Sequence, residues 1–349
     1  MKLIIVTQTI DEKDPNLGFF VRWVAEFAKN CEQVHVLALN VGTYELPRNV
    51  TVHCLGKSEG RSKLVWLWRL WRHSWQLRKD YDAVFVHMNP EYVIFGAPLW
   101  RVLGKRVGLW YAHGAVTLKL RLATLLSQVV LTSTLKGFRL PSKKRVIVGQ
   151  GIDTKRFAPT SSPNLIQDKL ELVTVGRISS AKNLDFLLGV AAALKKGGTN
   201  FRFRIVGAPQ SKNESEYLAK LHKQVKNLEL GEQVTFAGAV SQLDLPALLR
   251  ESHIFLSAGE TGSLDKTLLE AIACGIITLS SNEAYRDFAA SPGKKLTFEP
   301  NNIEELLRLI EQARNSQVGY LEETVRLRKE IERNHSIDNL VKNIITTYV

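Results

Sequence analysis

The stretch LVTVGRISSAKN at residues 172–183 decides how this chain can fold. It starts with a short run rich in β-branched residues, which is typical of a buried strand, and passes directly into Gly176. A helical pattern follows over 183–196. A strand, a glycine-containing loop and a helix in this order make a βα unit, from which parallel α/β sheets are built.

The same alternation continues on both sides of this unit. The expected strands are 3–7, 34–39, 50–54, 83–86, 107–111, 129–132 and 146–148 before it, and 203–206, 234–237, 254–256 and 277–280 after it. The expected helices include 19–30, 63–79, 215–227, 244–251, 267–274 and 303–313. Because strands that alternate with helices form parallel sheets covered on both faces, we predict an α/β protein with two doubly wound, Rossmann-like domains.

A Pro/Ser-rich stretch, 158–164, separates the two series and predicts a linker. We expect a first domain over 1–157 and a second over 158–334. A last helical pattern begins at Tyr320, after the second sheet is complete, and we expect its end, about 335–349, to pack back onto the first domain.

The composition indicates a folded globular chain of 349 residues, with 45% hydrophobic and 23% charged residues. Cys31, Cys54 and Cys274 are widely spaced, which argues against a disulfide framework or a metal site, so we expect no metal and no cofactor. The apolar run at the start ends at Thr7, and no uncharged stretch reaches the ~20 residues that cross a bilayer. We therefore expect a cytoplasmic protein.

The charge is distributed unevenly. The formal net charge is +13; residues 1–150 hold 22 Lys and Arg against 10 Asp and Glu, and residues 151–349 hold 25 against 24. All seven tryptophans lie in the first part. An anionic partner is expected, and nucleic acid is not favoured because no recognised nucleic-acid-binding module is present.

The loop after strand 172–175 has features of an anion site. Gly176 allows close approach of the backbone, and Arg177 and Lys182 flank the start of the next helix, whose free N–H groups favour an anion. Arg grips phosphate oxygens bidentately and Lys supplies a point charge. The alternative is a solvated pair of basic residues at a helix start.

A second loop, 259–266, follows strand 254–256 and opens a helix. Backbone N–H groups around its last four residues, Ser263, Leu264, Asp265 and Lys266, can cradle a phosphate. Glu270 comes one turn later, where a carboxylate can accept hydrogen bonds from two ribose hydroxyls. The alternative for Glu270 is a salt bridge on the helix surface.

These segments together resemble the retaining glycosyltransferases of the GT-B fold, a large family that includes sucrose synthases and mannosyltransferases of envelope biogenesis. The resemblance covers nearly the whole chain and is strongest over 146–285. The matching motifs are GQGIDTKRF (149–157), VGRISSAKNLDFLL (175–188), RIVGAP (204–209), VTFAGAVSQLDLPALL (234–249), LLEAIACG (268–275) and NHSIDNLVKNIITTY (334–348).

The resemblance implies a role for each matching residue. Arg177 and Lys182 hold the diphosphate of a nucleotide-sugar donor and stabilise the leaving nucleotide, while Glu270 holds the ribose. The segment 237–241, with Val240, faces the nucleobase. Gly18, after the first strand, lets the donor phosphate approach the first domain.

One position departs from the family pattern. The family has a glutamate eight positions before the ribose-binding one, near the transferred sugar, and here that position is Gly262. Glu260 and Asp265 are the nearest carboxylates. This leaves the sugar contacts and the level of activity open.

The first domain offers candidates for the acceptor. His113 follows strand 107–111, where the family places a histidine that contacts the sugar or the acceptor. His87 and Asn89 follow strand 83–86 and are second candidates. A histidine after a strand is otherwise more often structural.

Residues 61–79 form a helix with an unusual apolar face. At 100° per residue, one stripe contains Leu64, Leu67, Trp68, Trp71 and Trp75, with Arg61, Arg69, Arg72 and Lys79 along its side. One interpretation is docking at an anionic membrane surface, and the other is a core helix whose stripe faces its own sheet.

We therefore predict transfer of a sugar from a nucleotide diphosphate donor to a hydroxyl acceptor with retention, the acceptor being a lipid-linked or cell-envelope glycan at the membrane surface. The protein would be peripheral on the cytoplasmic face. Two alternatives remain: a membrane-associated sugar-nucleotide-binding protein with weak or no transferase activity, and a nucleotide-sugar epimerase of the same fold. A dinucleotide oxidoreductase is disfavoured because the first strand leads into TQTID, not a glycine-rich fingerprint.

Overall fold

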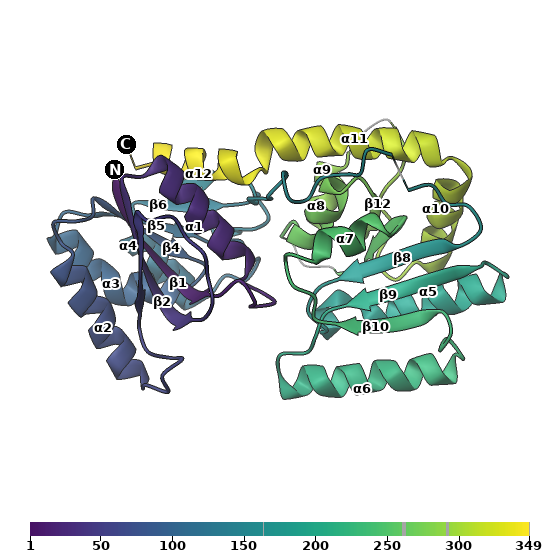
Figure 1. Cartoon of the computed structure of the whole chain (residues 1–349), viewed down its shortest axis with the longest axis horizontal. Helices are drawn as coiled ribbons and strands as arrows, with labels where there is room; N and C mark the ends of the chain where they lie inside the picture. The colour runs from purple at the N-terminus through teal and green to yellow at the C-terminus, as the bar shows by residue number, and fades with distance from the viewer. Residues whose placement is uncertain (163, 260–262, 291–292, 349) are drawn as a thin grey trace. The chain divides into compact units, whose positions relative to one another are not determined.

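The computed structural model describes residues 1–162, 164–259, 263–290 and 293–348 (Figure 1). The chain forms two compact units, each with its own parallel sheet. Unit 1 comprises Met1–Gly151 and Asn334–Val349, and unit 2 comprises Ile152–Arg333.

Unit 1 is built on a sheet in the order β3-β2-β1-β4-β5-β6-β7, and all its strand pairs are parallel. Its elements are β1 (Lys2–Ile10), α1 (Phe19–Asn30), β2 (Gln33–Val41), β3 (Val50–Cys54), α2 (Lys63–Gln76), β4 (Ala83–His87), α3 (Pro90–Val102), β5 (Arg106–Trp110), α4 (Leu118–Leu126), β6 (Val129–Thr132), β7 (Arg145–Ile147) and α12 (Ile337–Thr346).

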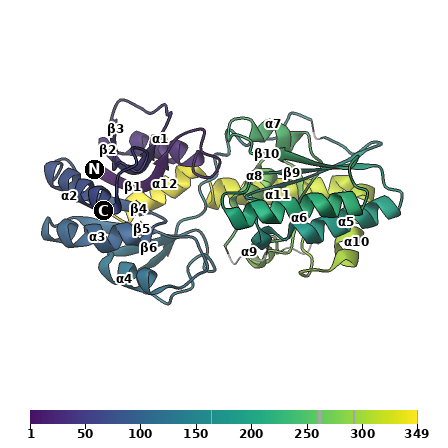
Figure 2. The same cartoon turned by 90° about the horizontal axis from the view of Figure 1, so that it is seen from below.

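Helices cover both faces of this sheet. One core cluster joins the sheet to α1 and α12, and a second joins its other face to α2, α3 and α4. Figure 2 shows α2, α3 and α4 side by side in a row. The terminal helix α12 starts after Ser336, whose side chain accepts a hydrogen bond from the N–H of Asn339, and it buries Leu340 and Ile344 in the core of unit 1.

Unit 2 is built on a parallel sheet in the order β10-β9-β8-β11-β12. Its elements are β8 (Leu170–Val175), the 3₁₀ turn η1 (Ser180–Lys182), α5 (Leu184–Lys196), β9 (Phe201–Val206), α6 (Lys212–Asn227), β10 (Val234–Gly238), α7 (Leu245–Arg250), β11 (Ile254–Ser257), α8 (Lys266–Ala273), β12 (Ile277–Ser280), α9 (Glu283–Phe288), α10 (Ile303–Asn315) and α11 (Gln317–Asn334).

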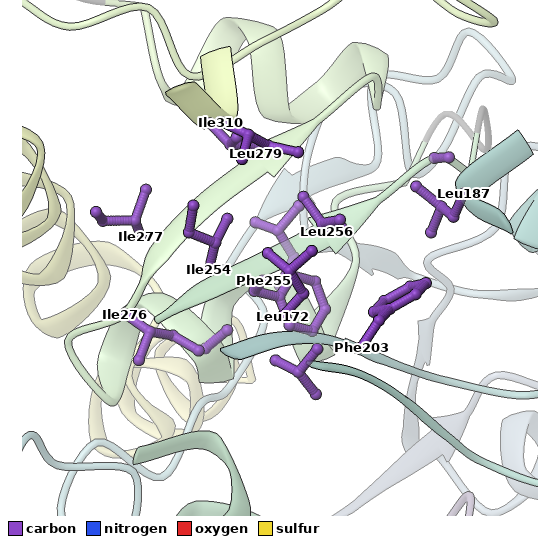
Figure 3. Packing of buried hydrophobic residues seen from close by; sticks show 14 of the residues in the cluster. Leu172, Leu187, Phe203, Ile254, Phe255, Leu256, Ile276, Ile277, Leu279 and Ile310 are labelled. Atoms are coloured by element: carbon purple, nitrogen blue, oxygen red, sulfur yellow. The ribbon is translucent and has the colours of Figure 1, made fainter. Parts of the chain in front are cut away.

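The core of unit 2 lies around its short β-branched strands. Figure 3 shows Leu172, Phe255 and Leu279 from three strands of the sheet, with Leu187 of α5 and Ile310 of α10 near them. The boundary between the units falls at Gly151, earlier than the expected break after residue 157, because Ile152 and Phe157 are buried in this core. The Pro/Ser-rich stretch therefore starts inside unit 2.

The strand order places one switch point in each sheet. In unit 2 the chain runs outward from β8 to β9 and β10 and then returns to β11 on the other side of β8. Ligands of doubly wound sheets bind outside the carboxyl ends of the strands at such a point. In unit 2 the loops at that point are those after β8 and β11, the two loops that the sequence analysis selected.

Candidate functional site

The switch point of unit 2 brings several glycine-containing loops close together. A Cβ on Gly207, which has a φ of +144°, would lie 1.8 Å from the carbonyl oxygen of Gly176. A Cβ on Gly259 would lie 3.1 Å from the carbonyl oxygen of Ala181. The loops after β8, β9 and β11 therefore approach one another through their backbones, which requires glycine at Gly207 above all.

Both predicted basic residues lie at this edge and are paired with carboxylates. Arg177 Nε lies 3.3 Å from Oε1 of Glu214 on α6, and Lys182, at the end of η1, forms an ion pair with Asp265. The Arg177 side chain is half-exposed. Two cationic side chains held by partners from other loops form an edge suited to phosphate.

Contrary to the prediction, the N-terminus of α5 does not offer its first N–H groups to a ligand at this edge. The Tyr217 hydroxyl accepts hydrogen bonds from the N–H groups of Leu184 (3.0 Å) and Asp185 (3.3 Å), and it donates to Asp185 Oδ1 at 2.5 Å. The prediction that this helix start offers free N–H groups to an anion is wrong, because a tyrosine from α6 occupies two of them. No local pattern predicts this contact, since Tyr217 lies more than 30 residues from Leu184 and Asp185 in the chain.

The N-terminus of α8 differs from that of α5. Asp265, its N-cap residue, makes no side-chain capping hydrogen bond to the helix and binds Lys182 instead. Ser263 is partly exposed before it, and its carbonyl accepts a hydrogen bond from the side-chain amide of Asn282. Leu264 has its side chain in the core, so only its backbone can face a ligand.

Glu270 lies one turn into α8 and is buried, with 2% of its surface exposed. Burial raises the pKa of its carboxyl to about 8, although the nearby Lys266 ammonium opposes this. Burial likewise lowers the pKa of Lys266 to about 7, against the attraction of Glu270 and Asp153. The surface salt bridge considered for Glu270 is therefore excluded.

The Glu270 carboxyl retains bonding capacity. Its Oε2 atom is buried and makes no hydrogen bond to any described residue. A buried oxygen without a partner costs free energy, which a ligand hydroxyl group at this place would recover. Glu270 thus has the chemistry to accept hydrogen bonds from a diol.

The remaining donor positions lie on neighbouring loops. Val240 is half-buried against the core of unit 2, and Ala237 and Gly238 next to it are exposed at the carboxyl end of β10. In unit 1, a Cβ on Gly18 would lie 2.6 Å from the carbonyl oxygen of Asp14, so packing within its own loop requires a glycine there. Gly262 lies outside the described residues.

In unit 1, His113 lies in the loop after β5 and is exposed. Its Nδ1 atom accepts a hydrogen bond from the N–H of Ala115 at 3.1 Å. A neutral imidazole with Nδ1 used as an acceptor carries its proton on Nε2. His113 therefore presents an N–H donor to a ligand oxygen.

The two second-rank candidates have structural roles in this fold. His87 is 2% exposed, and its ring stacks on Phe20 at 4.1 Å between centroids. Direct contact of His87 with an acceptor is not supported by this burial. Asn89 caps α3 by accepting a hydrogen bond from the N–H of Glu91 at 3.2 Å.

Helix α2 turns its aromatic stripe away from the sheet. The three tryptophans of the stripe are exposed, whereas Leu67 at its edge packs partly buried against the core and Leu70, off the stripe, is buried. The interpretation in which the tryptophans face the sheet is therefore wrong. The physical reason is Ser74, on the inner side of α2: its hydroxyl accepts from Trp100 Nε1 at 2.9 Å and its carbonyl accepts from the Tyr81 hydroxyl. These bonds fix the rotation of α2.

The described residues contain no cluster of three or more His, Cys, Asp or Glu side chains placed to hold a metal ion. None of the helices in the same part of the chain combines the length and the apolar composition needed to cross a bilayer.

Two parallel sheets, one of which carries paired cations and a buried carboxyl at its switch point, define a doubly wound α/β protein of the GT-B class. Over its whole length the chain resembles Anabaena Alr3699/HepE, solved with UDP and glucose, with 14% identity, a TM-score of 0.79 and 99% of each chain covered. It also resembles sucrose-phosphate synthase of Thermosynechococcus elongatus, with 14% identity, a TM-score of 0.80, and 100% and 98% of the two chains covered. These likenesses confirm the predicted fold class.

A family model described as "Glycosyl transferases group 1" matches residues 159–334. The chain belongs to this family. It is 26% identical over 188 residues to mannosylfructose-phosphate synthase of Agrobacterium fabrum, and 26% identical over 190 residues to the putative colanic acid biosynthesis glycosyltransferase WcaL of Salmonella typhimurium. The alignments cover 51% and 52% of this chain but only 41% and 45% of those relatives, less than half their length.

Proposed function

We propose that this protein transfers a sugar from a nucleoside diphosphate donor to a hydroxyl acceptor, with retention of configuration at the anomeric carbon. The observation that carries the proposal is the switch point of unit 2, where Arg177 and Lys182 follow β8 and the buried Glu270 lies in α8, which follows β11. Family membership and the UDP bound to Anabaena HepE support the same donor class.

In the proposed reaction, Arg177 and Lys182 neutralise the leaving diphosphate, and the N-terminus of α8 adds its partial positive charge. Glu270 accepts hydrogen bonds from the two ribose hydroxyls, and the segment 237–241 lies against the nucleobase. Gly18 lets the phosphate approach unit 1.

The chemical step needs no protein nucleophile. The bond from the anomeric carbon to the diphosphate oxygen breaks on the face where the acceptor oxygen forms its bond. The acceptor proton passes to the departing phosphate oxygen. The Nε2–H of His113 donates to an oxygen of the sugar or acceptor and orients it, and Gly262 supplies no carboxylate to the sugar.

We propose a lipid-linked or cell-envelope glycan as the acceptor, and a peripheral location on the cytoplasmic face of a membrane. The basic first half of the chain and the colanic acid relative support this class. One observation supports the alternative of a protein that binds a sugar nucleotide without transferring the sugar: Gly262 stands where the family has a glutamate. None of the described residues of the site favours an epimerase.

The test combines a donor panel with matched variants. Purified protein is assayed for nucleotide release and product formation with UDP-, GDP- and ADP-sugars, and Arg177→Ala and Lys182→Ala are each expected to lower kcat by about 10²–10³-fold. Lys195→Ala is the matched control, because Lys195 bonds to the Glu229 carbonyl at the far end of α5.

Two results would change the proposal. Unchanged turnover in both basic variants would refute the site. Tight donor binding without product, across plausible acceptors, would establish the binding protein and assign the loss of chemistry to Gly262.

A further inference from the structure

The outer surface of unit 1 has an unusual apolar character on α2. Trp68, Trp71 and Trp75 are all exposed there, and Leu64 at the start of the helix is 78% exposed. Single exposed apolar residues need no explanation, but aromatic side chains gathered on one helix face indicate an interaction surface.

The next two helices extend this surface. On α4, Leu118, Leu122 and Leu125 are exposed, with Leu118 at 79%, and on α3 Phe95 and Val102 are exposed. The helices α2, α3 and α4 lie side by side on one face of the sheet (Figure 2). We call the exposed apolar residues of these three helices together the three-helix face.

Contacts between the helices hold the three-helix face together. Trp71 Nε1 donates to the Phe95 carbonyl at 2.8 Å and so ties α2 to α3. Lys119 of α4 forms an ion pair with Glu91 of α3. The Trp71 ring is therefore held against α3, and α3 is tied to α4.

Basic groups accompany the aromatic rings. The guanidinium of Arg72 lies 5.2 Å from the centre of the Trp68 ring, and that of Arg78 lies 4.8 Å from the Trp75 ring. An Arg beside a Trp can place its charge at lipid phosphates while the ring enters the headgroup layer.

The net charge of the chain is concentrated in this region. Residues 61–146, which contain α2, α3 and α4, hold 16 Lys and Arg against three Asp and Glu, a net +13 that equals the net charge of the whole chain. One of the three acids, Glu91, is paired with Lys119. The rest of the chain is neutral overall, so an extended anionic partner would be attracted mainly to this region.

We propose that the three-helix face docks onto an anionic lipid bilayer, with its tryptophans and leucines at the headgroup level. A second copy of the chain fits poorly, because the same positive surface would face itself. Nucleic acid would use the charge and the aromatic rings, but it leaves Leu118, Leu122 and Leu125 without a role. Anionic membrane surfaces bind helices that combine Lys and Arg side chains with exposed Trp and Leu side chains.

This inference goes beyond the docking expected of residues 61–79, since it assigns half of the apolar contact to α3 and α4. Only the purpose of membrane docking rests on the proposed function: docking would hold the acceptor site near lipid-linked substrates. Binding to vesicles needs no donor, so the two proposals can fail separately.

The test is flotation with vesicles of phosphatidylcholine alone or with 30% phosphatidylglycerol. The wild-type protein is expected to float with the anionic vesicles only. Leu118→Ser/Leu122→Ser/Leu125→Ser on α4 and Trp68→Ala/Trp75→Ala on α2 are each expected to lower the bound fraction at least tenfold, as is Arg72→Glu/Arg121→Glu.

Matched controls lie on unit 2. Lys220→Glu/Lys223→Glu on α6 makes the same change in net charge, and Val318→Ser/Val325→Ser removes exposed apolar residues from α11. Both are expected to float as the wild type does. Circular dichroism melting and urea unfolding followed by tryptophan fluorescence establish that each variant is folded.

Brominated lipids give a second readout, because they quench tryptophans that enter the bilayer and all seven tryptophans lie in unit 1. Flotation of the α4 variant at the wild-type level, or of the wild type with neutral vesicles alone, would overturn the proposal. So would an absence of quenching, or preferential binding of RNA over anionic vesicles.

Discussion

The two units share one architecture and use their charges in opposite ways. In unit 2 the basic residues of the candidate site are held by carboxylates, as in the pairs of Arg177 with Glu214 and Lys182 with Asp265. In unit 1 the excess of basic residues lies on the helices and loops of one region, where few acids accompany it. Paired charges at a strand edge suit a small anionic ligand, whereas an unbalanced surface suits an extended one.

The tryptophans separate the units further. All seven belong to unit 1, where Trp23 and Trp100 are fully buried and Trp68, Trp71 and Trp75 are exposed. Unit 2 contains none, so tryptophan fluorescence reports unit 1 alone and circular dichroism reports both. Each difference between the units can be tested with this pair of probes.

The largest effect is expected from Trp100→Ala. The side chain is fully buried in unit 1 and donates to Ser74, so its loss leaves a cavity and an unpaired hydroxyl and should cost about 3–5 kcal/mol of unfolding free energy. Urea unfolding followed by tryptophan fluorescence should shift strongly, while donor binding by unit 2 is kept. A small shift would contradict the packing described for α2 and α3.

Gly207→Ala is the corresponding change in unit 2. The new Cβ would collide with the Gly176 carbonyl at a φ of +144°, and we expect a loss of about 2–3 kcal/mol with weaker donor binding. The circular dichroism transition should broaden or split, while the fluorescence transition of unit 1 stays in place. Gly231→Ala is the control, since a Cβ at Gly231 meets no described atom within 4 Å.

A pH-dependent effect is expected from Glu270→Gln. Folding raises the pKa of the Glu270 carboxyl to about 8, so the folded state holds this proton more tightly than the unfolded state does. The free energy of unfolding therefore falls as the pH rises above the pKa that the carboxyl has in the unfolded chain. Between pH 5 and pH 6 Lys266, with a folded-state pKa of about 7, stays largely protonated in both states and contributes little. The wild type should therefore lose up to about 1.4 kcal/mol per pH unit relative to Glu270→Gln.

The measurement is urea unfolding of both proteins at pH 5, 5.5 and 6, followed by circular dichroism. A constant difference across this range would show that Glu270 is not buried as described. Fluorescence of unit 1 should show no difference between the two proteins at any of these pH values.

The smallest effect on stability is expected from Trp75→Ala. Because the ring is exposed, its removal should change the unfolding free energy by about 0.5 kcal/mol or less, in contrast to Trp100→Ala. Fluorescence-detected urea unfolding compares the two directly. A loss near that of Trp100→Ala would mean that the outer face of α2 is packed, and the three-helix face would not exist as a surface.

Much of unit 2 was predictable because its signals are local. The run 172–183 contains its own strand, glycine and basic residues, and parallel strands bring the loops after β8 and β11 to one edge without further information. Helices α3 and α4 gave weaker signals: α3 contains Pro98 within the helix, and α4 has only nine residues.

The sequence by itself determined the α/β class, the repeated βα units and the loops that carry the candidate donor residues, because these depend on patterns within 10 to 20 consecutive residues. The tertiary structure alone decided that Tyr217 occupies the start of α5, that His87 is buried against Phe20, and that α2 turns its tryptophans outward. Those outcomes depend on contacts between residues distant in the chain. An amphipathic pattern shows that a helix has an apolar face, but packing against the sheet decides which face is covered.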